Sequence, residues 1–120
     1  MSKKILIAED EAALRMLYDR AFRKAGYEPV MVASAQDAVA KAGTESFSCI
    51  VLDIRMPGMD GIEGMQRILG SGKRCPIILN TAYTSYQDNF LTWSADAYVV
   101  KSSDTQPLIE TVDKLTERTA

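Results

Sequence analysis

Cys49-Ile50-Val51-Leu52 is a continuous run of apolar residues that stops at Asp53. A run of this kind is typical of a strand covered on both faces, as in a parallel sheet between layers of helices. Apolar segments at residues 4–8, 27–32, 76–80 and 97–100 predict four further strands. Pro29 favours a position at the edge of the sheet for the second of these strands, because proline has no backbone N–H to donate.

Segments with helical spacing alternate with these strands. The first helix is expected to run to about Ala25, where Gly26 ends it. The others are expected from Ser34 to near Gly43, across Ile62 to Leu69, over Tyr86–Trp93, and across Leu108 to Leu115. Five β-α units joined by short links predict an α/β domain with a five-stranded parallel sheet and helices on both faces.

The chain has 120 residues and neither a linker nor a repeat, so we expect a single domain over residues 1–120. A net charge of −2 gives no reason to expect nucleic acid or an anionic membrane as a partner. No apolar run approaches the roughly 18 residues that span a bilayer, and the N-terminus lacks the pattern of a secretory signal. Cys49 and Cys75 are expected to be core residues rather than disulfide partners, which favours a cytoplasmic protein.

Polar residues follow the predicted strands at their carboxyl ends, where ligands bind in open α/β sheets. Glu9 and Asp10 follow the first strand, Asp53 the third, Thr81 the fourth and Lys101 the fifth. Crowded carboxylates repel one another unless a cation neutralises them, and oxygen donors in a chain without histidine suit Mg²⁺. The set therefore predicts phosphoryl transfer onto a carboxylate, supported by Mg²⁺, a lysine and a hydroxyl.

The sequence resembles the receiver domains of two-component response regulators. The resemblance extends over nearly the whole chain, with matching segments at Ile5–Glu11, Ile50–Gly61, Ile77–Ala82 and Tyr98–Lys101. The segment from Ile50 to Gly61 is the most specific of the four. The resemblance implies a flavodoxin-like sheet with the strand order 2-1-3-4-5.

The resemblance also implies roles for the residues of the site. Asp53 would accept a phosphoryl group from the phosphohistidine of a histidine kinase or phosphotransfer protein. Mg²⁺ would be held by Glu9, Asp10, Asp53 and the main-chain carbonyl of Arg55. Lys101 would pair with the phosphoryl group, and Thr81 and Tyr98 would form a switch. Such a protein is a signalling switch that promotes its own phosphorylation and dephosphorylation rather than an enzyme.

Two positions depart from the family pattern. The family usually has a proline after the lysine, often with a cis peptide bond, whereas Ser102 follows Lys101 here. A cis bond before a non-proline residue costs about 3–4 kcal/mol, so the sequence leaves open whether the bond before Ser102 is cis or trans. The family also tends to have glycine where Ser94 stands, and its loss is expected to change the end of the fourth helix.

Three other functions are compatible with a sheet of this kind. An aspartyl phosphohydrolase would commonly carry a second aspartate two positions after Asp53, where Arg55 stands. A flavin-binding module would need a phosphate-binding loop after the first strand, but Glu9-Asp10-Glu11 would repel a phosphate there. A degenerate receiver that no longer accepts phosphate would be expected to have lost acceptor residues, and all of them are present.

The output of this receiver is expected to be a contact with another protein, because no effector domain follows Ala120. We therefore expect a stand-alone regulator of the chemotaxis or sporulation type. Five of the nine aromatic residues lie between positions 83 and 98, which places the predicted output surface from Tyr83 to Lys101 and on the last helix. Thr81 and Tyr98 are predicted to convey phosphorylation to this surface. Arg55 and Tyr83, each two residues beyond a site residue, are predicted to set the lifetime of the phosphoryl group.

Overall fold

The computed structural model describes residues 2–82 and 94–117. Within these ranges the strands are β1 (Lys4–Ala8), β2 (Glu28–Val32), β3 (Cys49–Leu52), β4 (Ile77–Thr81) and β5 (Ala97–Val100). The helices there are α1 (Ala12–Lys24), α2 (Ala35–Thr44), α3 (Gly61–Gly70) and α4 (Gln106–Glu117). All neighbouring strands are parallel, in the order β2-β1-β3-β4-β5, which confirms the predicted fold. The predicted helix over Tyr86–Trp93, and with it the effect of Ser94 on that helix, lies outside the described residues.

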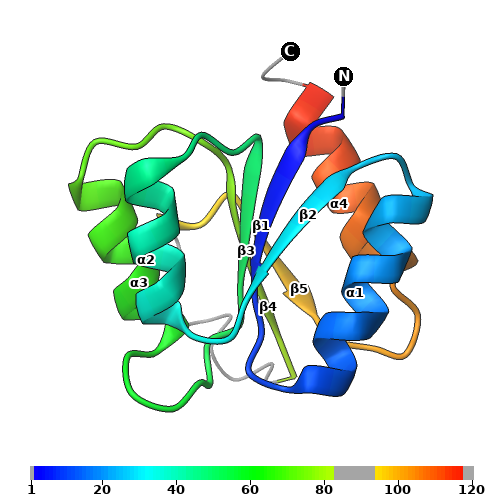
Figure 1. Cartoon of the computed structure of the whole chain (residues 1–120), viewed down its shortest axis with the longest axis horizontal. Helices are drawn as coiled ribbons and strands as arrows, with labels where there is room; N and C mark the ends of the chain where they lie inside the picture. Colours follow the sequence, from blue (N-terminus) through cyan, green and yellow to red (C-terminus); the bar gives the residue numbers. More distant parts are fainter. Residues whose placement is uncertain (1, 83–93, 118–120) are drawn as a thin grey trace.

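The central strand β3 is buried along its whole length, as its apolar sequence predicts. Its side chains alternate between two core layers because successive residues of a strand point to opposite faces. Ile50 and Leu52 pack with the side chains of α2 and α3, whereas Cys49 and Val51 pack with those of α1 and α4. Figure 1 shows the two pairs of helices on opposite sides of the sheet.

The helices begin and end largely where the sequence predicts. The Ser34 hydroxyl accepts a hydrogen bond of 3.1 Å from the backbone N–H of Asp37 at the start of α2, and Gly26 follows α1 with a φ of 95°. Pro107 lies in the first turn of α4, where its missing N–H breaks no helical hydrogen bond. Leu17 and Leu69 fit the apolar spacing of α1 and α3 but are 40% and 37% exposed, because they lie at the margin of the apolar face of each helix.

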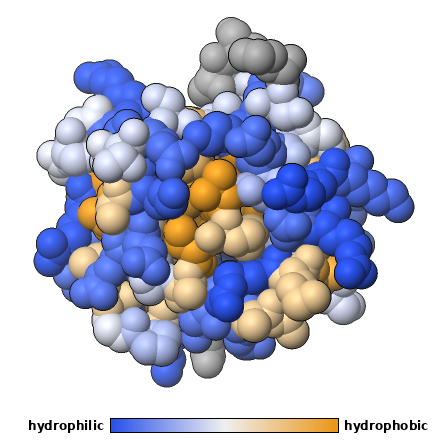
Figure 2. Space-filling view, viewed as in Figure 1, coloured by the Kyte–Doolittle hydropathy of each residue, from blue (hydrophilic) through white to orange (hydrophobic). Residues whose placement is uncertain are grey.

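The edge position predicted for β2 is confirmed, and it explains why Pro29 is accommodated. The Glu28 N–H donates to Lys3 at 2.9 Å and the Val32 carbonyl accepts from Glu9 at 3.0 Å, so these residues face β1. Because backbone groups of a strand alternate in direction, Pro29 and Met31 face the free edge. Figure 2 shows apolar residues gathered over this strand, between the hydrophilic surfaces of α1 and α2.

The two cysteines are free thiols, which confirms the prediction that they do not form a disulfide. Cys49 is buried in the layer with α1 and α4, whereas Cys75 packs against the layer with α2 and α3. The sheet therefore separates the two sulfur atoms. None of the helices in the described part of the chain has the length and apolar character needed to cross a membrane.

Candidate magnesium and phosphoryl site

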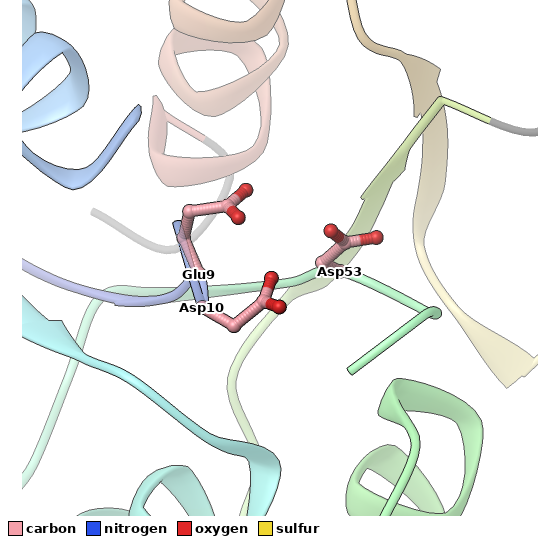
Figure 3. Close-up of side chains that lie close together, drawn as sticks. All are labelled: Glu9, Asp10 and Asp53. Atoms are coloured by element: carbon pink, nitrogen blue, oxygen red, sulfur yellow. The ribbon is translucent and has the colours of Figure 1, made fainter. Parts of the chain in front are cut away.

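Three carboxylates meet at the carboxyl edge of the sheet. Glu9 and Asp10 follow β1, and Asp53 follows β3; the register pairs Ala8 with Leu52, which brings the two strand ends level. One oxygen from each carboxylate lies within 4.8 Å of the others. Figure 3 shows the three side chains close together. Glu9 is 1% exposed and Asp53 6% exposed, whereas Asp10 faces solvent. The structure thus brings together the acidic residues that the sequence predicts.

Lys101 joins this cluster from β5. Its Nζ atom lies 2.5 Å from Glu9 Oε1 and 2.7 Å from Asp53 Oδ2. Its backbone N–H donates to the Thr81 carbonyl at 2.8 Å, which fixes the lysine beside the end of β4. Burial favours the neutral form of Lys101, but the hydrogen bonds to Asp53 and Glu9 outweigh it and raise the pKa of the ammonium. The lysine is therefore charged, with two carboxylates bound to it.

Glu9 is the most buried of the three acids. Burial raises the pKa of its carboxyl group above the ordinary value, although the hydrogen bond from Lys101 acts in the opposite direction. Its Oε2 atom also accepts a hydrogen bond of 3.1 Å from the Glu11 N–H. The position of the Glu9 carboxylate is thus set from two sides.

Arg15 fixes the loop that carries these acids, a role that the sequence alone does not reveal. Its guanidinium donates to the Glu9 carbonyl at 2.8 Å and to the Asp10 carbonyl at 2.9 Å. A cation one turn into the helix, five residues after Asp10, was the only signal in the sequence. Because one guanidinium holds both carbonyls, the backbone direction of both acids is coupled to α1.

Gly61 is a second residue whose importance the sequence did not reveal. A Cβ atom at this position would lie 2.0 Å from the main-chain oxygen of Asp53, far inside van der Waals contact. The Gly61 N–H donates to the Ile54 carbonyl at 2.9 Å. The start of α3 is therefore pressed against the backbone of Asp53, and only glycine allows this approach.

The predicted switch residues lie on the two strands beside the site. Thr81 is fully buried as the last residue of β4, and Tyr98 is half-buried on β5, packed against the layer with α2 and α3. Arg55 is exposed in the loop after Asp53, and its backbone N–H donates to Asp53 Oδ1 at 3.3 Å. Tyr83 lies outside the described residues.

The loop after Lys101 is built without a cis peptide bond, and none occurs among the described residues. The Ser102 hydroxyl donates to the Asp104 carbonyl at 2.9 Å and accepts from the Asp104 N–H at 3.1 Å. The Asp104 carboxylate then accepts from the Gln106 N–H at the start of α4. Side-chain hydrogen bonds thus order this loop.

The donor set fits a hard divalent cation. The three side chains offer only oxygen atoms, and their three negative charges exceed the single positive charge of Lys101. Mg²⁺ commonly binds one or two carboxylates, keeps several waters and leaves room for a phosphoryl oxygen. The exposed Asp10 beside the buried Asp53 provides such an open arrangement. Mg²⁺ is therefore the cofactor that this site accommodates.

An open parallel α/β sheet with an acidic, lysine-containing site at its carboxyl edge defines a class of phosphoryl-accepting domains. The sequence matches the response regulator receiver domain family over residues 5–113. The chain therefore belongs to this family, which favours the receiver function over an aspartyl phosphohydrolase or a flavin-binding module.

Several relatives are known by sequence. The chain is 35% identical over 83 residues to sporulation initiation phosphotransferase F of Bacillus subtilis, covering 69% of this chain and 67% of that protein. It is 33% identical over 103 residues to the regulatory protein PhoP of the same organism, covering 84% of this chain and 43% of PhoP. The chain thus spans less than half the length of PhoP.

Solved structures agree with the fold and the metal. TrrA of Thermotoga maritima, solved in complex with Mg²⁺-BeF, is 37% identical and superimposes with a TM-score of 0.90, covering 94% of this chain and 98% of TrrA. TrrA has also been solved in complex with the histidine kinase ThkA, with a TM-score of 0.88 and the same identity.

Proposed function

We propose that Asp53 accepts a phosphoryl group from the phosphohistidine of a histidine kinase or phosphotransfer protein. An Asp53 carboxylate oxygen would form a bond to phosphorus as the phosphorus–nitrogen bond of the donor breaks, and the released imidazole nitrogen would take up a proton. The observation that supports this most is the position of Asp53, which is buried at a strand end, 2.7 Å from the Lys101 ammonium and beside Glu9 and Asp10. The complex of TrrA with ThkA supports a histidine kinase as the donor.

Each neighbouring residue has a distinct part in this proposal. Mg²⁺, held by Glu9, Asp10, Asp53 and the main-chain carbonyl of Arg55, would neutralise charge on the phosphoryl oxygens. The Lys101 ammonium would pair with a phosphoryl oxygen in place of its present contact with Asp53. The two carboxylates beside this lysine keep it charged.

The test uses acetyl phosphate as a small phosphoryl donor in the presence of Mg²⁺. Intact-mass measurement should show one added phosphoryl group, and Asp53→Asn should abolish it. Asp60→Asn is the matched control, because it removes an exposed carboxylate that caps α3 while retaining a capping side chain. Labelling of the Asp53→Asn variant at another residue would refute the assignment.

We further propose that Thr81 and Tyr98 convey phosphorylation to an output protein. The Thr81 hydroxyl would turn toward the phosphoryl group, and Tyr98 would move into the space left behind. The output surface would extend from Tyr83 to Lys101 and onto α4, although residues 83–93 of it lie outside the described ranges. Thr81→Ala should still be phosphorylated but should bind its output partner as the unmodified protein does.

The phosphoryl lifetime is proposed to depend on Arg55 and Tyr83. Arg55 is exposed beside Asp53, where its side chain can cover the approach of water. Arg55→Ala and Tyr83→Ala should each change the dephosphorylation rate measured after removal of the donor. Rates equal to that of the parent protein would show that neither residue covers the site.

The domain acts as a receiver switch in signalling. We propose that residues 1–120 form one receiver domain, that it does not turn over a separate substrate, and that it works in the cytoplasm. The two free thiols are consistent with a reducing compartment. A pull-down with and without beryllofluoride, a phosphoryl mimic, would identify the kinase and output partners.

A further inference from the structure

A buried polar pair lies beside the site, on the side of the sheet covered by α1 and α4. The side-chain amide of Asn80, on β4, donates a hydrogen bond of 3.1 Å to the hydroxyl of Tyr18, on α1. Asn80 is 3% exposed and Tyr18 4% exposed. Replacing a buried hydrogen-bonded pair by apolar groups of the same shape is often nearly neutral, so stability alone does not account for this pair.

The pair lies on the face of the sheet to which the Lys101 side chain points. Asn80, Asp53 and Lys101 point to the same face of the sheet, because the residues two positions before them all pack in the layer with α1 and α4. Those residues are Ile78, Val51 and Val99. Strand β4 lies between β3 and β5. To reach Asp53 from the end of β5, the lysine must therefore cross β4. Asn80 lies opposite Val99 and is the residue on that face nearest to the carboxyl end of β4.

Two further observations connect the pair with the lysine. Burial raises the pKa of Tyr18, and the charges of Lys101, Glu9 and Asp53 also act on it, which places its hydroxyl in the electrostatic field of the site. A cavity of about 10 Å³ separates the pair from the loop after Lys101. This volume holds at most one water, so the pair and the loop are closely packed.

We propose that Tyr18 and Asn80 form a positioning pair for Lys101. The pair sets the path of the lysine stem, so that the ammonium lies between Glu9 and Asp53 before phosphorylation and beside the phosphoryl group afterwards. Neither side chain contacts the reacting atoms. The inference rests on the proposed function of Asp53 and adds a second, buried determinant of its phosphorylation rate.

The first test compares two variants that each lose one phenolic hydroxyl. Tyr18→Phe should slow labelling by acetyl phosphate and Mg²⁺ by about fivefold. This is the size expected when the hydrogen bond between Asn80 and Tyr18, which orders the pair, is lost. Tyr27→Phe is the matched control, because Tyr27 donates to Asp113 at the opposite end of the sheet. It should leave the rate unchanged. Equal rates for parent and Tyr18→Phe would overturn the proposal.

A double-mutant cycle separates positioning from a general structural effect. Tyr18→Phe should have no effect on labelling when Lys101 is replaced by Met, because the ammonium that it positions is then absent. Additive effects of the two substitutions would overturn the proposal. Loss of labelling in Asp53→Asn tests the proposed function separately, so the failure of one idea is distinguishable from the failure of the other.

A second readout requires neither phosphorylation nor metal. The carbon-13 resonance of the Lys101 ε-methylene group should shift in metal-free Tyr18→Phe, and it should remain at the parent position in Tyr27→Phe. The double variant Tyr18→Phe with Asn80→Leu guards against unfolding, because it removes both partners and leaves no buried polar group unsatisfied. An unchanged Lys101 resonance in this folded double variant would also overturn the proposal.

Discussion

Charged side chains are arranged differently at the two ends of the sheet. At the carboxyl edge, Glu9 and Asp53 are almost fully buried and share a single lysine, with Asp10 adjacent. At the amino edge, the Glu45 carboxylate pairs with Lys4 at 2.7 Å and with Lys41 at 3.0 Å, and all three side chains are about one-third exposed or more. The first cluster has excess negative charge, and two of its three carboxylates are almost closed to solvent. The second cluster has two lysines for one carboxylate and is open to solvent.

This difference shows how one fold separates stability from function. At the amino edge, the ion pairs of Glu45 are screened by solvent, and such pairs add little to stability. At the carboxyl edge, the carboxylates of Glu9 and Asp53 are buried, which is energetically costly, and one lysine does not balance their charge. A cation or a phosphoryl group can therefore change the energy of the carboxyl edge far more than that of the amino edge.

The largest effect is expected from a methyl group at the carboxyl edge. Gly61→Ala would place Cβ 2.0 Å from the Asp53 carbonyl oxygen, so we expect a loss of at least about 4 kcal/mol in the free energy of unfolding. Gly43→Ala, in α2 near the amino edge, meets no atom within 4 Å and should be neutral or stabilise the helix by up to about 1 kcal/mol. Urea denaturation measures both. Similar stabilities for the two variants would contradict the close approach of α3 to Asp53.

Removing one lysine from each edge tests the contrast in charge directly. Lys101→Met leaves two buried carboxylates without their ammonium, and we expect a loss of about 3 kcal/mol in metal-free buffer. Lys4→Met removes one of two partners of Glu45, whose side chain is 31% exposed, and its smaller effect should vanish in high salt. Equal losses that respond equally to salt would mean that the two edges do not differ.

Addition and removal of Mg²⁺ should sharpen the comparison. Mg²⁺ at about 100 times its dissociation constant should stabilise the parent protein by about 2.7 kcal/mol, and EDTA should reverse the effect. Asp10→Ala should remove most of this response, because it deletes a ligand at the carboxyl edge. Glu45→Ala deletes a carboxylate at the amino edge and should retain the full response. Thermal melts with and without Mg²⁺ provide the measurement.

The smallest effect concerns the amino edge at high pH. Burial and the hydrogen bond to Asp113 raise the pKa of Tyr27 to about 12. Because the folded protein holds this proton more tightly than the unfolded chain, the contribution is complete below pH 10 and is lost as the pH rises toward 12. The stability difference between the parent and Tyr27→Phe should therefore be constant from pH 7 to 9 and decrease above pH 10. A difference that grows above pH 10 would contradict the bond to Asp113.

The sheet could be predicted from the sequence because its signals are local. The apolar run at Cys49 to Leu52, the proline in the second strand and the serine before α2 each act through neighbouring residues. The margins of the helices were harder to predict. Leu17 and Leu69 fit the apolar spacing, but their exposure depends on how far each helix turns against the sheet, which spacing along one helix does not specify.

The site was predictable only in part, for a related reason. Glu9, Asp10, Asp53 and Lys101 follow strands, so the topology alone brings them together. Arg15, Gly61 and the pair of Tyr18 with Asn80 act through contacts between distant segments. A tyrosine among leucines and an asparagine in an apolar strand each have many explanations until the three-dimensional structure shows that they meet.

The backbone of Pro29 faces the free edge of β2, and this orientation affects whether the protein aggregates at high concentration. An uncovered outer strand is a template on which another chain can add a strand, and sheet extension of this kind leads to aggregation. At the free edge of β2, one of the positions that would donate to an incoming strand is Pro29, which has no hydrogen to give. The residue thus costs the native sheet no hydrogen bond and makes intermolecular strand addition unfavourable. Pro29→Val should fold normally yet aggregate faster on shaking at high concentration.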